Sequence, residues 1–455
     1  MSLDLGGLSN PVTSIGDLVA YVKGAERPPD RWLIGVEHEK IGVRGPRYEP
    51  VLYYGPDGIR GLLDAIARSA GGTQHKHKEN GQPVALLSKD ASVTLEPGGQ
   101  LELSGAPLRS FADVRGEIEA HLAQVRRDSH NIAWLATGYR PFGTREQVPW
   151  MPKGRYAAMK SSLGNKGRLA LDMMLMTATV QANLDWSDEA DLASKVRAAT
   201  AVSPLVSAMF ANSPLVDGRD CGYLDFRYQV WRETDAARCG LLEQMLQPDW
   251  GYRRYVEWAI DVPMLFVRSG TLYRDARGQT FRDWLESGRL ASGEKSPPTL
   301  SHWVDHLSTL FPEVRVKRVL ELRGADVVPL PLMIALPALW VGLLYDPNAR
   351  EDAAKLTRDW KFSELLQFQG DVARVALRAK GPDGATALDL GRDLLAIARA
   401  GLKGWEQVSG LDESRNLDPL SEVLDSGRTY AERALEAYRA SGGDPTSLVK
   451  LWQIA

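Results

Sequence analysis

Alternating apolar and polar residues in two short segments place glutamates in rows. In residues 32–43 (WLIGVEHEKIGV), Glu37 and Glu39 stand two positions apart, so in a strand both side chains point to one face. In residues 92–107 (SVTLEPGGQLELSGAP) the odd positions are apolar, and the even, mostly polar positions are Thr94, Glu96, Gln100, Glu102 and Ser104. A row of carboxylates on a rigid sheet is unfavourable through like-charge repulsion unless cations bind it. The pattern therefore predicts a metal site.

Three further segments repeat this alternation: residues 174–186 (MLMTATVQANLDW), 223–231 (YLDFRYQVW) and 318–326 (RVLELRGAD). Strict alternation over this many residues is typical of half-buried strands. Their polar faces carry residues suited to metals and small anions, namely Gln181, Asn183, Asp225, Arg227, Gln229, Trp231, Glu321 and Arg323. We predict an α+β fold in which a curved, mainly antiparallel sheet encloses a polar basin and helices cover its apolar back. Because the intervals between strands are long and helical, we do not expect sequential hairpins to explain the topology.

Helix signals occur between these strands. Residues 58–70 have helical periodicity and stop at two glycines. Ser110 resembles the first residue of a capping box and predicts a helix to about Leu135. Ser187 precedes an acidic first turn and predicts another helix.

The most apolar run, residues 330–345, is interrupted by Pro331 and Pro337 and is shorter than the roughly 18 residues that a membrane span needs. It is interpreted as buried core, and no membrane association is expected. Residues 350–455 are charged and helical in pattern, which predicts a supporting helical region. Without repeats or long linkers, residues 1–455 are predicted to form a single integrated catalytic unit.

Composition narrows the class of protein and its compartment. A net charge of −3 and a pI near 6.2 give no support for nucleic-acid binding. The N-terminal residues 1–10 lack the pattern of a secretory signal or transit peptide. With two cysteines in the chain, we expect a reducing compartment, the cytosol. Cys221 and Cys239 are interpreted as buried free thiols, with a redox-sensitive disulfide as the alternative.

The carboxylates suit hard cations that prefer oxygen ligands, with Mg²⁺ favoured, Mn²⁺ as the alternative, and no acidic loop of the kind that binds Ca²⁺. The alternative is that they are solvated strand charges, but two such clusters inside apolar strands favour metal binding. His38 points to the opposite face of its strand and is expected to be packed or hydrogen-bonded. His75 and His77, flanked by lysines, are expected in a solvated loop.

Nucleotide-binding loops of the P-loop and GxGxxG kinds are absent from the sequence. Residues 151–160 (MPKGRYAAMK) offer Lys153, Arg155 and Lys160, which suit phosphate binding, with a solvated loop as the alternative. Metals and cationic side chains around a polar basin favour phosphoryl transfer.

Taken together, the motifs resemble the plant-type glutamate–cysteine ligases (γ-glutamylcysteine synthetases), including their bacterial members. The resemblance covers most of the chain and is carried by GVEHEKIG, SVTLEPGGQLELSGAP, MPKGRYAAMK, LDMMLMTATVQANLDWSDEADL, FANSPL, WRETDAARCG, HWVDHLSTLFPEVRVKRVLELRGAD and LPALWVGLLYD. It implies ATP-dependent joining of the γ-carboxylate of L-glutamate to the amine of L-cysteine through γ-glutamyl phosphate, the first step of glutathione biosynthesis. It also implies a bowl-shaped antiparallel sheet related to that of glutamine synthetase.

The resemblance also implies roles for single residues. The Mg²⁺ ions that bridge the ATP phosphates would be held by Glu37, Glu39, Glu96, Glu102, Gln181 and Glu321. Gln181 stands where distant bacterial ligases carry a histidine ligand. Arg227, with Trp231 nearby, would bind the α-carboxylate of glutamate.

Two further roles concern the phosphates. Arg323, which shares a face with Glu321, would stabilise the transferring phosphoryl group as part of the catalytic machinery. Arg155 and Lys160 would contact the phosphates of the nucleotide.

One departure concerns the cysteines. Plant members carry additional cysteines that form regulatory disulfides, whereas Cys221 and Cys239 do not fall at those positions. We therefore expect a bacterial member in the cytoplasm without plant-type redox control, as a monomer or homodimer. The alternatives are a related carboxylate–amine ligase with a different amine acceptor, or a regulatory protein that binds Mg²⁺ and nucleotide without catalysis.

Overall fold

The computed structural model describes residues 8–55 and 57–455, so part of the N-terminal segment on which the targeting prediction rests lies outside the described residues. Within these ranges, ten strands form one open sheet in which every neighbouring pair is antiparallel. The strand order is β15-β16-β8-β1-β6-β5-β4-β3, and β2 and β7 both pair with β1. The strands are β1 (Ile34–Arg44), β2 (Glu49–Pro50), β3 (His75–Glu79), β4 (Gln82–Leu87), β5 (Ser92–Leu95), β6 (Leu101–Ser104), β7 (Ile132–Leu135), β8 (Val180–Leu184), β15 (Val314–Val316) and β16 (Leu320–Leu322). The predicted α+β class with a mainly antiparallel sheet is confirmed.

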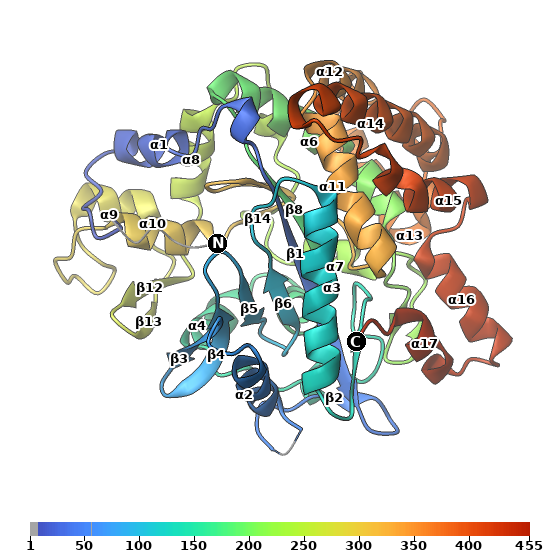
Figure 1. The fold of residues 1–455 in the computed structure, drawn as a ribbon. Coiled ribbons are helices and arrows are strands. Elements are labelled where there is room, and N and C mark those ends of the chain that lie inside the picture. Colours follow the sequence, from blue (N-terminus) through green and yellow to red (C-terminus); the bar gives the residue numbers. More distant parts are fainter. Residues whose placement is uncertain (1–7, 56) are drawn as a thin grey trace.

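Helices pack on one face of the central strand β1. The helices α3 (Phe111–Asp128) and α11 (Leu330–Leu344) both contact this strand, and Figure 1 shows them side by side in front of the sheet. His38 is fully buried on this face, with its ring edge-on to that of His121 from α3. The interpretation of His38 as a packed residue is therefore confirmed, as is that of residues 330–345 as buried core.

The remaining elements surround the sheet. In Figure 1 the last helices of the chain gather on one side of it, and α8–α10 lie on the other side together with β12 and β13. The helices on the first side are α12 (Pro347–Lys355), α13 (Phe362–Val375), α14 (Ala387–Ser409), α15 (Asp418–Ser426), α16 (Tyr430–Ala440) and α17 (Val449–Trp452). The other elements are α1 (Ile15–Lys23), α2 (Ile59–Ser69), α4 (Gly154–Leu163), α5 (Ala170–Met176), α6 (Glu189–Met209), α7 (Phe226–Arg232), α8 (Tyr252–Asp261), α9 (Phe281–Ser287), α10 (Leu300–Leu307), β9 (Leu215–Val216), β10 (Arg219–Asp220), β11 (Cys239–Gly240), β12 (Phe266–Ser269), β13 (Leu272–Asp275) and β14 (Phe311–Pro312). The single catalytic unit over residues 1–455 stays a prediction.

The strand predicted over residues 223–231 is wrong, because this segment forms helix α7. The carboxylate of Asp225 caps the helix by accepting a hydrogen bond from the backbone N–H of Tyr228 at 2.8 Å, a start signal that alternation does not register. Arg227 and Trp231 still share a face, since residues four apart are neighbours on a helix.

Other boundaries also differ from the predictions. The strand predicted over residues 174–186 starts only at Val180, because the residues up to Met176 complete helix α5. Residues 75–79 form strand β3, so the loop predicted there is wrong, although His75 and His77 are solvent-exposed as expected. Strands β3 to β6 follow one another as hairpins, so the expectation of no sequential hairpins is wrong for this half of the sheet.

Two of the three predicted helices need adjustment. Helix α2 agrees with the prediction. Helix α3 ends at Asp128 rather than near Leu135, because the backbone becomes extended at Ser129 and residues 132–135 form β7. Helix α6 is capped by Asp188, one residue after the predicted Ser187.

Two observations concern the membrane and cysteine predictions. In the described ranges, no single helix is long and apolar enough to cross a membrane; α11 and α12 meet those criteria only together and are bent by 97°. Cys221 and Cys239 are free thiols in this structure, as predicted, and burial raises the pKa of Cys239 to about 12.

Candidate active site

A cavity of about 310 Å³ opens on the face of the sheet opposite α3 and α11. Most of the predicted site residues meet in it: it is lined by Glu37, Glu39, Glu96, Glu102, Arg155, Gln181, Arg227, Trp231 and Arg323. Lys153, Arg315 and Lys317 line it as well. Two predicted residues, Lys160 and Glu321, are absent from the lining.

The carboxylates on this face are brought together by strand register. Glu39 of β1 stands opposite Glu102 of β6, and Glu37 stands opposite Gln181 of β8. Residues directly opposite one another project from the same face of a sheet, so two strands far apart in sequence contribute to one row. Three of the carboxylates have a neutral hydrogen-bond donor: the backbone N–H of Thr179 for Glu39 at 3.0 Å, the hydroxyl of Thr94 for Glu102 at 2.6 Å, and the amide of Asn183 for Glu37 at 2.9 Å.

The carboxylates of this row repel one another. Burial, with repulsion from Glu321 and Glu102, raises the pKa of Glu37 to about 7. Burial and then Glu96 raise the pKa of Glu102, and burial, Glu96 and Glu102 raise the pKa of Glu39 well above its usual range. A cluster of oxygen donors with this surplus of negative charge fits a hard divalent cation.

The described donor atoms are of the chemical type that binds a hard cation, but they do not by themselves form a complete coordination sphere. Across residues 8–55 and 57–455, no three Asp, Glu, His or Cys side chains are arranged so that they could hold a metal ion as they stand. A hard cation such as Mg²⁺ usually keeps water or substrate phosphates among its ligands, so few protein ligands need to converge.

The structure does not support Glu321 as a metal ligand. This carboxylate is fully buried and bonded bidentately by Arg315, with Nη2 to Oε1 at 2.7 Å; Arg323 and Lys317 contact it at 3.0 and 3.3 Å. Burial alone would raise the pKa of Glu321, but these cations, Arg315 foremost, hold it well below its usual range. Both carboxylate oxygens thus already have cationic partners from the protein.

Arg323 links this ion-pair cluster to the carboxylate row. Its Nη1 atom lies 2.7 Å from Oε1 of Gln181 and 3.0 Å from Oε1 of Glu321. Its guanidinium carbon lies 5.8 Å from the centre of the Trp231 ring. The amide oxygen of Gln181, predicted as a metal ligand, therefore accepts a hydrogen bond from a cation in this structure.

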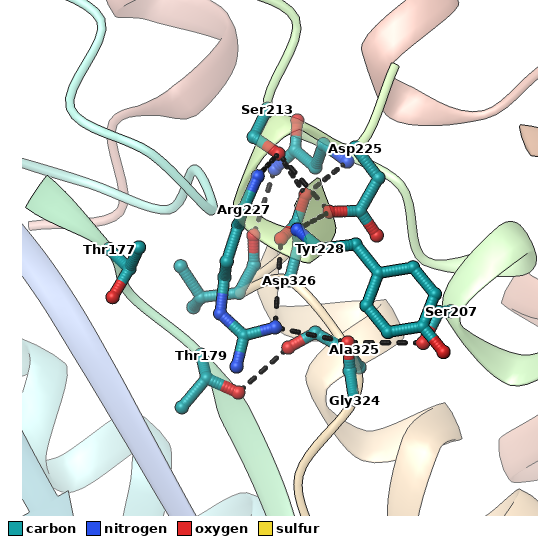
Figure 2. Close-up of polar contacts among 12 residues, drawn as sticks. Thr177, Thr179, Ser207, Ser213, Asp225, Arg227, Tyr228, Gly324, Ala325 and Asp326 are labelled. Atoms are coloured by element: carbon teal, nitrogen blue, oxygen red, sulfur yellow. Dashed lines mark hydrogen bonds and ion pairs between the residues drawn. The ribbon is translucent and has the colours of Figure 1, made fainter. Parts of the chain in front are cut away.

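Arg227 reaches the cavity from α7, and Figure 2 shows its guanidinium between Thr179 and the Gly324–Asp326 segment. Nη1 and Nη2 donate to the backbone carbonyls of Gly324 and Arg323 at 3.0 and 2.9 Å, which fixes the plane of the group. In the described chain, Nε of Arg227 and the indole N–H of Trp231 have no hydrogen-bond partner, although both are buried. These donors are suited to an anionic ligand in the cavity.

The residues at 151–160 separate into two groups. Lys153 and Arg155 line the cavity, with Nζ of Lys153 donating to the Leu95 carbonyl at 2.7 Å and Nη2 of Arg155 to the Ser308 hydroxyl at 3.2 Å. Lys160 is solvent-exposed, and its Nζ lies 4.9 Å from the centre of the Trp150 ring. The helical turn of α4 points Lys160 away, so the structure does not bring it to the predicted site.

Sequence reasoning missed Arg315 and Lys317 in the cavity wall. Arg315 lies between the buried residues Val314 and Val316 on the short strand β15 and stands opposite Glu321, and Lys317 directly follows this strand. The signal was present as two cations of equal parity in RVKR, but three residues are too few for a strand prediction.

The comparisons with known proteins agree with the predicted family. The glutamate–cysteine ligase family 2 (GCS2) profile matches residues 33–450. The chain is 39% identical over 435 residues to the chloroplastic glutamate–cysteine ligase B of Oryza sativa subsp. japonica, covering 95% of this chain and 85% of that protein. It is 40% identical over 424 residues to the chloroplastic glutamate–cysteine ligase of Medicago truncatula, covering 93% and 81%.

A solved structure shares the fold. The crystal structure of the glutamate–cysteine ligase from Francisella tularensis in complex with AMP superposes with a TM-score of 0.51 at 14% identity, covering 92% of this chain and 86% of that chain.

The predicted location in a bacterial cytoplasm is contradicted by the relatives, which are named as chloroplastic enzymes of plants. The predicted family is confirmed by the extent of the matches. The chain belongs to glutamate–cysteine ligase family 2.

Proposed function

We propose that this cavity is where the ligase joins the γ-carboxyl of L-glutamate to the amine of L-cysteine with ATP, forming γ-glutamylcysteine for glutathione biosynthesis. One observation carries the proposal: a single cavity holds both a row of mutually repelling carboxylates and guanidinium groups whose Nε atoms have no hydrogen-bond partner in the described residues. Phosphoryl transfer to a carboxylate needs both: oxygen ligands for the cation that accompanies ATP, and guanidinium groups for the anionic reactants.

The carboxylates of the row would hold Mg²⁺, and their set is Glu37, Glu39, Glu96 and Glu102. When bound, Mg²⁺ neutralises charge on the ATP phosphates and aligns them for transfer. The structural relative in complex with AMP supports a nucleotide as ligand of this fold. Lys153 and Arg155, which also line the cavity, would contact the phosphates.

Arg227 and Trp231 would bind glutamate. The guanidinium presents donors to the α-carboxylate, and the indole N–H supplies a further donor. This leaves the γ-carboxylate to face the ATP phosphates.

Arg323 would stabilise the phosphoryl group during transfer. Its contacts with Glu321 and Gln181 fix its guanidinium before substrate arrives, so it needs no reorganisation as charge develops. The amine of cysteine then displaces phosphate from γ-glutamyl phosphate.

An acceptor screen tests the function. Purified protein with ATP, Mg²⁺ and glutamate is supplied with cysteine, 2-aminobutyrate, alanine or glycine, and ADP release and the γ-glutamyl product are measured. We expect the largest kcat/KM with cysteine and no net ADP release without an amine. A larger value with another amine would identify a related ligase with a different acceptor, and nucleotide binding without any turnover would favour a regulatory protein.

A further inference from the structure

Two aspartates lie behind Arg227, on the side away from the cavity. Asp225 and Asp326 are both fully buried, one at the start of α7 and the other in the segment that follows β16 (Figure 2). The hydroxyl of Ser213 lies between them, 2.7 Å from Oδ2 of Asp326 and 3.4 Å from Oδ1 of Asp225. The same hydroxyl accepts a hydrogen bond from the backbone N–H of Arg227 at 3.1 Å.

Asp326 is held by hydrogen bonds to one carboxylate oxygen and by close packing at the other. Its Oδ2 atom accepts from the backbone N–H of Asn212 at 2.8 Å as well as from Ser213. Its Oδ1 atom lies 4.0 Å from Nη1 of Arg227 and has no hydrogen-bond partner in the described residues. A side chain at Gly138 would place its Cβ 2.0 Å from that oxygen, so the carboxylate is packed directly against this glycine.

Asp326 and Arg227 are also connected through the backbone. The carbonyls that accept from the guanidinium belong to Arg323 and Gly324, which stand three and two residues before Asp326. Anchoring Asp326 therefore anchors the acceptors of Arg227, and the orientation of the guanidinium depends on both the buried charge and the loop.

The charges explain why two acids are tolerated beside one guanidinium. Burial, and then repulsion from Asp326, raises the pKa of Asp225 well above its usual range. Burial also raises the pKa of Asp326, to about 6, with Arg227 opposing the shift. One proton on this pair of acids would make the group of Arg227 and the two acids neutral, so that it would not repel an anionic substrate.

We propose that Asp326, supported by Ser213 and Asp225, is a positioning residue that fixes the guanidinium of Arg227 for the α-carboxylate of glutamate. The inference rests on the proposed role of Arg227 in glutamate binding. Oδ1 of Asp326 faces Nη1 of Arg227 at 4.0 Å, whereas Asp225 caps helix α7.

The different tasks of the two acids predict different effects of the same substitution. Asp326→Asn removes the charge and can turn an amide N–H toward Arg227, so we expect the KM for glutamate to rise at least tenfold. Asp225→Asn keeps an oxygen for the Tyr228 N–H and a donor toward Asp326, so we expect a rise of less than threefold. The KM for ATP should change less than twofold in both variants, because the nucleotide is proposed to bind on the other side of the cavity.

The experiment measures KM for glutamate and for ATP, with melting temperatures, in these two variants, Ser213→Ala, Asp185→Asn and Arg227→Lys. Ser213→Ala removes the bridge at smaller structural risk, and at least a threefold rise in KM for glutamate is expected even if Asp326→Asn does not fold. Asp185→Asn is the matched control, a buried carboxylate outside the cavity that accepts from the Leu33 N–H at 2.8 Å. Its loss should lower the melting temperature without changing the ratio of the two KM values.

The outcomes separate this inference from the proposed function. If Arg227→Lys leaves the KM for glutamate unchanged, the assigned role of Arg227 is wrong. If Arg227→Lys raises it but Asp326→Asn and Ser213→Ala do not, or if KM for ATP rises equally, the positioning role of Asp326 is overturned while the glutamate site stands.

Discussion

At the two ends of the cavity-lining face of the sheet, glutamates have opposite electrostatic environments. At the β16 end, Glu321 is surrounded by Arg315, Lys317 and Arg323, and its pKa lies well below its usual range. At the β1–β6 end, the hydrogen-bond donors to Glu39 and Glu102 in the described residues are neutral, and burial together with repulsion raises the pKa of both.

This difference distinguishes Glu321, whose charge the protein itself neutralises, from the carboxylates that we propose as Mg²⁺ ligands. The β16 end is neutralised by the protein itself, and its ion pairs hold Arg323 in place. The β1–β6 end is left with a charge surplus that destabilises the free protein and that a bound cation would relieve. Substitutions at the two ends test this comparison.

The largest effect is expected for Glu321→Gln. Removing one member of a buried ion-pair cluster leaves Arg315 and Arg323 without their counter-charge, which typically destabilises by about 3–5 kcal/mol. Urea denaturation should show this loss in the free energy of unfolding, with or without Mg²⁺. A change below about 1 kcal/mol would mean that this carboxylate is not a structural charge.

The same substitution at the other end, Glu102→Gln, is expected to act on catalysis. It removes a proposed Mg²⁺ ligand, so kcat should fall at least about 100-fold, equivalent to about 2.7 kcal/mol. The free energy of unfolding without Mg²⁺ should stay equal or rise, because one of the repelling charges is gone. Steady-state kinetics over a range of Mg²⁺ concentrations measure the fall in kcat, and parallel urea denaturation measures the change in the free energy of unfolding. Near-normal turnover would show that Glu102 is not a metal ligand.

A smaller effect concerns pH and Glu37. Its pKa rises from an ordinary 4.5 to about 7 on folding, so the folded chain binds the proton more tightly than the unfolded chain. The free energy of unfolding should therefore fall as the pH rises from about 4.5 to about 7, by on the order of 2 kcal/mol after discounting for solvent. Saturating Mg²⁺ should abolish this decrease, because it stabilises the ionised form. Thermal melting of the parent and of Glu37→Gln at pH 5–8 isolates the contribution; equal slopes in both proteins would contradict it.

How far the sequence predicts the fold depends on the range of the interactions involved. Alternation located β1, β5, β6 and β16, because one face of each is buried and the period is two. It failed at residues 223–231, where the cap by Asp225 and packing of α7 override a pattern that fits a strand as well. The boundary of α3 was missed for a related reason: the backbone becomes extended at Ser129, and no change in periodicity marks this position.

The site residues could be predicted where alternation along a strand fixes which face a side chain lies on. They could not be predicted where their role depends on contacts with residues distant in sequence. Glu37 and Glu39 face the cavity because they share parity on β1. Glu321 also has the expected parity, but its ion pair with Arg315 comes from a hairpin register that local sequence does not reveal. The buried partners of Arg227 could likewise not be predicted from the sequence, since Ser213 and Asp326 come into contact only in the folded chain.

The smallest effects are expected at the nucleotide end and compare two cations of one helix. Arg155→Ala should raise the KM for ATP about tenfold, equivalent to about 1.4 kcal/mol, because its guanidinium lines the cavity and its Nε has no protein partner in the described chain. Lys160→Ala, five residues further along α4 and exposed, should change that KM less than twofold. Since both substitutions remove one positive charge from the same helix, a long-range electrostatic effect on ATP would appear in both, and screening by 0.3 M salt would reduce it. Equal effects that disappear in salt would contradict direct contact by Arg155, whereas a tenfold effect confined to Arg155 and retained in salt would place the phosphates at this end of the cavity.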